Sequence, residues 1–260
     1  MGSAAVHAQV WGPGVNDWAD IQEGQCAGMY PAILDALALP EGGSVLDVGC
    51  GTGLFSKAAR ERGLLVTGID ASEVFIERAK RRVEAATFVT GEMEELPFAD
   101  EMFDAAVGCN AFQYAASPVH ALTEARRVVK NGRSVAIAVW GSPERCEAAS
   151  HIKALGTLLP PAPPGSPGPF ALSNADALQS LLRDAGLHPE GVREVEVTWQ
   201  YRDEEHTLRG MMSAGPAIRA RAHAGDDATR EALREAIAPY RQSDGTFRMK
   251  NVFIFALGRK

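Results

Sequence analysis

Short apolar runs alternate with amphipathic segments between residues 44 and 140, and this alternation is the clearest structural signal in the chain. Five runs rich in Val, Ile, Leu and Phe predict strands: 44–49, 64–69, 87–90, 103–109 and 134–140. Three segments between them repeat apolar residues at helical spacing: 54–62, 72–83 and 117–129. Strands that alternate with helices indicate βαβ units, and therefore a parallel sheet covered on both faces.

The regions before residue 44 and after residue 140 do not show this alternation of strands and helices. Helices are predicted at 18–23 and 31–39, and then at 173–185, 203–213 and 226–238. Further strands are predicted at 192–201 and 247–257, and the proline-rich segment 160–169 predicts a surface loop. We therefore expect four parts: an N-terminal helical cap segment (1–40), a Rossmann-like core (41–202), a helical cap insertion (203–245) and a final core strand (246–260).

Composition narrows the functional classes. The 260 residues carry 26 basic and 33 acidic side chains, a net charge of −7, which argues against a nucleic-acid partner because phosphate backbones require a basic surface. The four cysteines show no metal-binding spacing, so no metal site is expected. The chain shows neither a membrane-spanning run nor a secretion signal, so we expect a cytoplasmic protein. Its oligomeric state stays open.

The first predicted strand runs directly into a glycine-rich loop, Asp47-Val-Gly49-Cys50-Gly51-Thr-Gly53, and then into a helix. Such a loop lets a ligand lie against bare backbone. The second strand ends at Asp70, where a carboxylate can accept hydrogen bonds from ribose hydroxyls. A nicotinamide dinucleotide is the alternative ligand, but the third glycine is displaced from the GxGxxG pattern and Asp47 would repel phosphates.

These motifs resemble the class I S-adenosylmethionine-dependent methyltransferases, in particular the type 11 group that includes ubiquinone and menaquinone methyltransferases. The segment 45–53 is similar to the first motif of that family, and Gly68-Ile-Asp70-Ala71-Ser72 to its ribose-binding strand end. Two further segments follow in the family's order: Gly91-Glu-Met-Glu-Glu-Leu-Pro-Phe98, and Glu124-Ala-Arg-Arg127 with the residues up to Gly132. Glu92 and Met93 stand where the family usually has Asp and Ala.

The resemblance implies a doubly wound α/β fold with a seven-stranded sheet, whose last strand is antiparallel, and a helical cap. It also implies S-adenosyl-L-methionine as cofactor and S-adenosyl-L-homocysteine as product. The cofactor-binding residues that it implies are Asp47, Gly49, Cys50, Gly51, Gly53, Asp70, Ala71, Glu92, Met93 and Asn110.

The expected function is methyl transfer to a small, partly apolar molecule, with an O, N or C acceptor unresolved. A closed apolar cavity is expected between residues 11–30, 110–114 and 203–218. Candidate catalytic residues are His206, Tyr30 and Tyr114, and candidate substrate-binding residues are Trp18, Gln113 and Met211. The alternatives are a methyltransferase fold that binds the cofactor without methylating, and a nicotinamide oxidoreductase.

Overall fold

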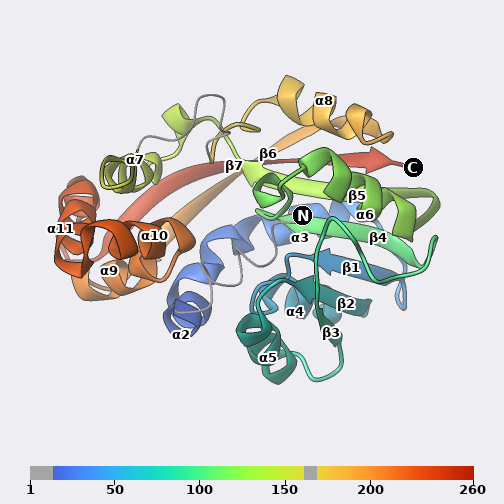
Figure 1. The fold of residues 1–260 in the computed structure, drawn as a ribbon, viewed down its shortest axis with the longest axis horizontal. Helices are drawn as coiled ribbons and strands as arrows, with labels where there is room; N and C mark the ends of the chain where they lie inside the picture. Colours follow the sequence, from blue (N-terminus) through green and yellow to red (C-terminus); the bar gives the residue numbers. More distant parts are fainter. Residues whose placement is uncertain (1–13, 161–168) are drawn as a thin grey trace.

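A computed structural model describes residues 14–160 and 169–260, which form a seven-stranded sheet with the order β3-β2-β1-β4-β5-β7-β6 (Figure 1). Its strands are β1 (Ser44–Val48), β2 (Leu65–Asp70), β3 (Thr87–Thr90), β4 (Phe103–Cys109), β5 (Val129–Trp140), β6 (His188–Tyr201) and β7 (Phe247–Arg259). Strands β1 to β5 pair in parallel, and β7 runs antiparallel to both β5 and β6. The predicted doubly wound α/β sheet with an antiparallel last strand is confirmed.

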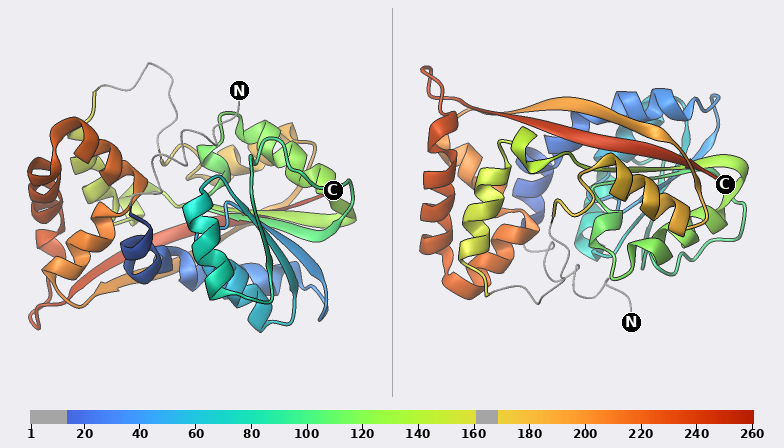
Figure 2. Two further views of the ribbon diagram at one scale, coloured as in Figure 1. Left: turned by 60° about the horizontal axis from the view of Figure 1, so that its bottom comes forward. Right: turned by 90° about the horizontal axis from the view of Figure 1, so that it is seen from above.

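Helices cover both faces of the sheet (Figure 2). One face packs against α3 (Tyr30–Leu37), α4 (Leu54–Glu61) and α5 (Glu73–Arg82). The other packs against α6 (Pro118–Val128) and α8 (Ala175–Asp184). Successive strand residues point to opposite faces, so Val45 joins the first core and Leu46 the second. Burial on both faces explains why these strands are apolar throughout.

Side-chain caps fix where several helices begin. The Ser72 hydroxyl accepts a hydrogen bond from the Phe75 amide, and the Ser117 hydroxyl accepts one from the His120 amide, so the first residues of the predicted segments 72–83 and 117–129 are the caps of their helices. The helix predicted over 173–185 has its cap at Asn174 and not at residue 173. Asn174 has the extended backbone of an N-cap, and its Oδ1 accepts the Ala177 amide at 2.8 Å.

Several elements differ from the sequence prediction. Strand β5 begins at Val129 instead of at the predicted residue 134, and the added residues are accommodated by a register shift against β4. Helices α7 (Ala149–Thr157) and α10 (Gly215–Ala224) were not predicted. The single helix predicted at 18–23 is a π-helical turn, Trp18–Gln22, followed by a 3-10 segment, Glu23–Met29, after the short helix α2 (Val15–Asp17).

Strands β6 and β7 continue beyond the rest of the sheet. Strand β7 meets β5 only from Phe253 onward, and residues 247–252 pair with β6 but not with β5. This ribbon leads to α9 (Glu204–Met212), α10 and α11 (Asp226–Ile237), which gather with α7 at one end of the molecule (Figures 1 and 2). In the described part of the chain, no helix combines the length and apolar character needed to cross a bilayer.

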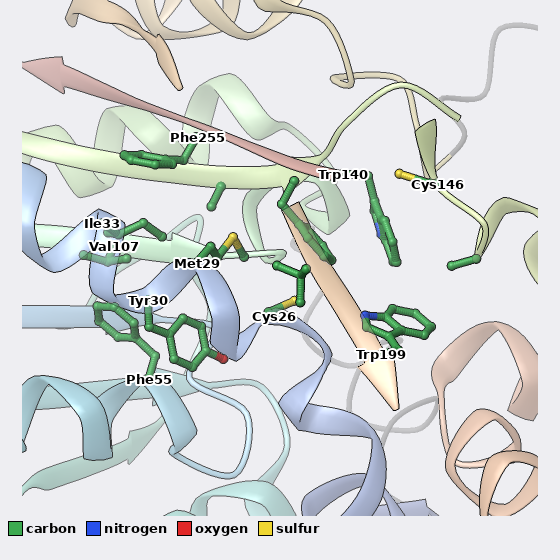
Figure 3. Packing of buried hydrophobic residues seen from close by; sticks show 14 of the residues in the cluster. Cys26, Met29, Tyr30, Ile33, Phe55, Val107, Trp140, Cys146, Trp199 and Phe255 are labelled. Carbon is green, nitrogen blue, oxygen red and sulfur yellow. The ribbon is translucent and has the colours of Figure 1, made fainter. Parts of the chain in front are cut away.

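The N-terminal segment, residues 18–29, packs between the glycine-rich side of the sheet and the extended ribbon. The Trp199 indole N–H donates to the Gln25 carbonyl at 3.1 Å, and the Tyr201 hydroxyl bonds Gln22 Oε1 at 2.9 Å. Figure 3 shows Cys26, Met29 and Tyr30 among core side chains from several elements. The segment is therefore an integral part of the core.

Candidate functional site

A cavity that is partly open to solvent lies at the carboxyl ends of β1, β2, β3 and β4. Parallel sheets of this kind bind ligands at that edge, because the loops that leave the strands diverge there. The cavity is lined by Trp18, Glu23, Gln25, Cys26, Tyr30, Asp47, Gly49, Cys50, Gly51, Phe55, Ile69, Asp70, Ala71, Phe75, Gly91, Glu92, Met93, Cys109, Asn110, Ala111 and Tyr114.

The glycine-rich loop adopts a backbone that side chains disfavour. Gly49, Gly51 and Gly53 have φ angles of 67°, 55° and 86°. A Cβ atom at Gly49 would lie 2.6 Å from the Cβ of Ala111, in the loop after β4. Asn110 also has a positive φ, 55°, and lines the cavity. Asn tolerates this conformation better than most residues, and such strain clusters at functional sites.

Asp70 holds the loop as well as facing the cavity. Its Oδ2 accepts the Gly51 amide and its Oδ1 accepts the Ser72 amide, both at 2.9 Å. The sequence placed Asp70 at the end of the second strand, as a ligand-binding carboxylate. The structure shows that this carboxylate also connects the first and second strand ends.

Asp47 is a buried carboxyl at the end of β1. Its Oδ2 accepts a 2.6 Å hydrogen bond from the Ser56 hydroxyl on α4, and its exposed fraction is 1%. Burial raises the pKa of Asp47 to about 7, the Ser56 hydrogen bond opposes this, and the charges of Glu23 and Asp70 add to it. Asp47 is therefore poised to change its charge near neutral pH.

Glu23 is a site residue that the sequence analysis missed. This N-terminal carboxylate is buried against the glycine-rich loop, where its Oε1 accepts the Thr52 amide at 2.8 Å. Its Oε2 accepts the Thr52 hydroxyl at 2.5 Å and bonds Arg82 of α5. No sequence motif pointed to the contact between Glu23 and Thr52, because the two residues lie 29 positions apart in the chain.

Another part of the cavity lining follows β2 and β3 and consists of Ala71, Gly91, Glu92 and Met93. Phe75 and Trp18 also line the cavity, and their rings stack with centroids 6.3 Å apart. The loop that carries Glu92 is fixed from α6. Arg127 donates to the carbonyls of Leu96 and Phe98, at 2.9 and 2.8 Å, and to both carboxylate oxygens of Glu124. The motif segments 91–98 and 124–132 are thus two halves of one structural unit.

The remaining wall contains thiols and phenols. Burial raises the pKa of Cys26 and of Tyr114 to about 12, and raises those of Tyr30 and Cys109 as well. These groups keep their protons at neutral pH. Tyr30 and Tyr114 can therefore donate hydrogen bonds, but their phenols are poorly suited to act as bases.

The structure brings together most of the residues singled out in the sequence. The cavity contains Trp18, Tyr30, Asp47, Gly49, Cys50, Gly51, Asp70, Ala71, Glu92, Met93, Asn110 and Tyr114. Outside its lining lie Gly53, Gln113, His206 and Met211. Trp11, another aromatic of the expected cap, lies outside the described residues.

Gly53, Gln113 and Met211 do not line the cavity, and each contacts other parts of the structure. Gly53 precedes α4, where a Cβ would lie 3.1 Å from that of Ala79. The Gln113 amide donates to Asn110 Oδ1 at 2.7 Å and so positions a cavity residue. Met211 is 1% exposed in the core.

His206 lies in α9 and packs edge-on against Tyr201 at the end of β6, with 6.1 Å between the ring centroids. Burial lowers the pKa of His206. Among the described residues, none from 203–218 lines the cavity, so the structure does not place this part of the cap around it as expected.

The chain is similar in sequence to known methyltransferases. Residues 46–137 match the model of a methyltransferase domain. The chain is 44% identical over 91 residues to malonyl-[acyl-carrier protein] O-methyltransferase of Erwinia pyrifoliae, a match that covers 35% of each protein. It is 29% identical over 203 residues to 27-O-demethylrifamycin SV methyltransferase of Amycolatopsis mediterranei, covering 72% of this chain and 71% of that protein. The match thus spans about a third of the first relative's length.

Solved structures share the fold. The YcgJ protein of Bacillus subtilis superposes with a TM-score of 0.59 at 20% identity, covering 89% of this chain and 98% of that one. The [4+2]-cyclase SpnF superposes with a TM-score of 0.58 at 20% identity, covering 99% of this chain and 92% of that one. The motif order, the sheet and these likenesses agree: residues 46–137 form a methyltransferase domain, and the findings support a class I S-adenosylmethionine-dependent methyltransferase.

Proposed function

We propose that this protein transfers the methyl group of S-adenosyl-L-methionine to a small, partly apolar molecule, with S-adenosyl-L-homocysteine as product. The observation that carries the proposal is the set of three carboxylates, Glu23, Asp47 and Asp70, along the glycine-rich side of one cavity at the strand ends. Carboxylate oxygens at these positions can accept hydrogen bonds from the ammonium group of this cofactor and attract its sulfonium.

The residues present fit the cofactor. Asp47 would hold its amino end, and Asp70 would accept the ribose hydroxyls, since a carboxylate oxygen can accept more than one hydrogen bond. Gly49, Cys50, Gly51 and the Asn110 carbonyl would flank the methionine part. Ala71, Glu92 and Met93 would frame the adenine.

A dinucleotide fits less well. Each backbone amide from Gly49 to Gly53 already donates within the protein, to the Ile69 carbonyl, Asp70, Glu23 or the Cys50 carbonyl. A pyrophosphate would therefore meet acceptors where it needs donors. This arrangement argues against the nicotinamide alternative.

Bound S-adenosyl-L-methionine would supply an already activated methyl group. The contribution of the protein is then mainly alignment of the acceptor, which can be worth roughly 7 to 11 kcal/mol. Tyr30 and Tyr114 are placed to orient an acceptor by hydrogen bonding. His206, which lies outside the cavity lining, is not retained as a base.

We propose that the acceptor is small and partly apolar, because part of the cavity wall is apolar. This part is formed by Cys26, Tyr30, Phe55 and Cys109. The two relatives are named for different acceptors, malonyl-[acyl-carrier protein] and 27-O-demethylrifamycin SV.

Titration calorimetry and a product assay test the proposal. We expect S-adenosyl-L-methionine and S-adenosyl-L-homocysteine to bind and NAD to bind far more weakly. Asp70→Ala should weaken binding roughly tenfold or more, because a charged hydrogen-bond acceptor is lost. Release of S-adenosyl-L-homocysteine with a small-molecule acceptor library would support methyl transfer. Cofactor binding without turnover on any acceptor would favour a binding role, and tighter binding of NAD would contradict the proposal.

A further inference from the structure

The Glu23 carboxylate occupies the position at which a glycine-rich loop ordinarily receives an anionic ligand. The loop leads into the N-terminus of α4, where the helix dipole attracts negative charge. Glu23 reaches this place from the N-terminal segment and takes the Thr52 amide and hydroxyl. It comes so close that a Cβ on Gly51 would lie 3.0 Å from its Oε1.

Arg82 completes this arrangement from α5. Its guanidinium bonds Glu23, donates to the Thr52 hydroxyl at 2.9 Å, and donates to the Ala19 carbonyl at 3.0 Å. An amide, a hydroxyl and a guanidinium thus converge on one carboxylate. The same three donors would suit a phosphate oxygen equally well if the carboxylate were removed.

We propose that Glu23 is a specificity-determining residue, an internal anion that closes the glycine-rich loop to phosphate and pyrophosphate ligands. This inference rests on the proposed function and extends it. It explains why a glycine-rich loop that resembles a phosphate-binding loop would bind S-adenosyl-L-methionine, whose ammonium and sulfonium groups are cationic, and not a nucleotide phosphate. Glu23 is supplied by the N-terminal segment, so the selection depends on that segment being docked.

The main test is a gain of binding. In Glu23→Ala the three donors lose their carboxylate, so inorganic pyrophosphate should bind at least roughly tenfold more tightly than it binds the wild-type protein. Affinity for S-adenosyl-L-methionine should fall in the same variant. The matched control is Asp20→Ala, which removes an exposed ion pair with Arg78 from the same segment and leaves the loop untouched. That variant should gain no affinity for pyrophosphate.

Glu23→Gln distinguishes the effect of the negative charge of Glu23 from the effect of its side chain filling the position beside Thr52. The amide keeps an acceptor for Thr52 but loses the charge, so it should bind pyrophosphate with a smaller gain than Glu23→Ala, of about threefold or more. Thermal melts monitor folding, and Glu23→Gln decides the question if Glu23→Ala does not fold. No gain in the folded variants would overturn the inference. Tighter binding of S-adenosyl-L-methionine would also overturn it, because Glu23 would then compete with the cofactor.

The two proposals fail in different ways. If the wild-type protein binds neither S-adenosyl-L-methionine nor S-adenosyl-L-homocysteine, the proposed function is wrong. A gain of pyrophosphate binding in Glu23→Ala would still stand in that case, as evidence that Glu23 fills an anion site. If the cofactor binds and the gain is absent, only the role of Glu23 is contradicted.

Discussion

Asp47 and Ser56 lie on opposite sides of the glycine-rich loop, and the Ser56 hydroxyl donates a 2.6 Å hydrogen bond to the buried Asp47 carboxylate. This contact joins the end of β1 to α4 and spans the loop between them. It also favours the charged form of Asp47 within an environment that otherwise opposes charge. The balance between burial and this hydrogen bond should control how the site responds to pH.

Cofactor affinity should therefore rise with pH around neutrality. With a pKa of about 7, Asp47 is mostly protonated at pH 6 and mostly ionised at pH 8. If only the ionised form holds the cofactor's ammonium group, affinity for S-adenosyl-L-homocysteine should increase roughly tenfold over this range. Calorimetry at intervals of half a pH unit measures the profile. Ser56→Ala should shift its midpoint upward, and Asp47→Asn should flatten it, whereas a flat wild-type profile would contradict this role for Asp47.

The same carboxyl should make the empty protein less stable as pH rises. The unfolded chain releases this proton near its ordinary pKa of 3.8, while the folded chain keeps it up to about 7. The folded state thus binds more protons between these values, so this group's contribution to stability falls as pH rises, by roughly 4 kcal/mol in total.

Asp47→Asn should remove that loss. The variant should melt at a higher temperature than the wild-type protein at pH 8 and should lose this advantage at pH 4.5. Asp184→Asn, which removes an exposed carboxylate, serves as the control and should show no such difference. An Asp47→Asn variant that is equally destabilised at both pH values would argue that the carboxylate is needed for packing alone.

Gly49→Ala should damage the site beyond the cost of backbone strain. The added Cβ would lie 2.6 Å from that of Ala111, so the loop has to move. Gly132 offers a matched control, because its φ of 71° resembles the 67° of Gly49 but a Cβ there would meet nothing within 4 Å. We expect Gly132→Ala to cost about 1 to 2 kcal/mol and to leave cofactor affinity unchanged. Gly49→Ala should cost more and abolish measurable binding. Equal unfolding free energies for the two variants would contradict the close approach.

Arg127→Lys should weaken the loop that carries Glu92 and Met93. The Arg127 guanidinium meets two carbonyls and both oxygens of Glu124 in a planar geometry that an ammonium cannot reproduce. We expect a loss of about 2 kcal/mol in the free energy of unfolding and a severalfold loss of cofactor affinity. Arg126→Lys is the neighbouring control, since within the described residues Arg126 donates one hydrogen bond, to the Gly186 carbonyl. Urea unfolding and calorimetry measure both effects, and equal behaviour of the two variants would refute the assignment.

The sequence alone determined the parts of this protein that depend on local pattern. Apolar runs predicted β1 to β5, since strands buried on both faces must be apolar along their whole length. Ser72 and Ser117 marked helix starts because capping is a contact over three residues. The spacing from Asp47 to Asp70 placed both carboxylates at strand ends, and the parallel order of β1 and β2 then brought them to one cavity.

Only the tertiary structure decided what depends on contacts between distant segments. Glu23 became a site residue because residues 18–29 dock on β6 and α5, which no local pattern encodes. His206 and Met211 looked suitable in sequence, but the long β6–β7 ribbon carries their helix to the end of the molecule, away from the cavity lining. Burial, which sets the pKa values of Asp47 and Tyr114, is likewise a property of packing in three dimensions.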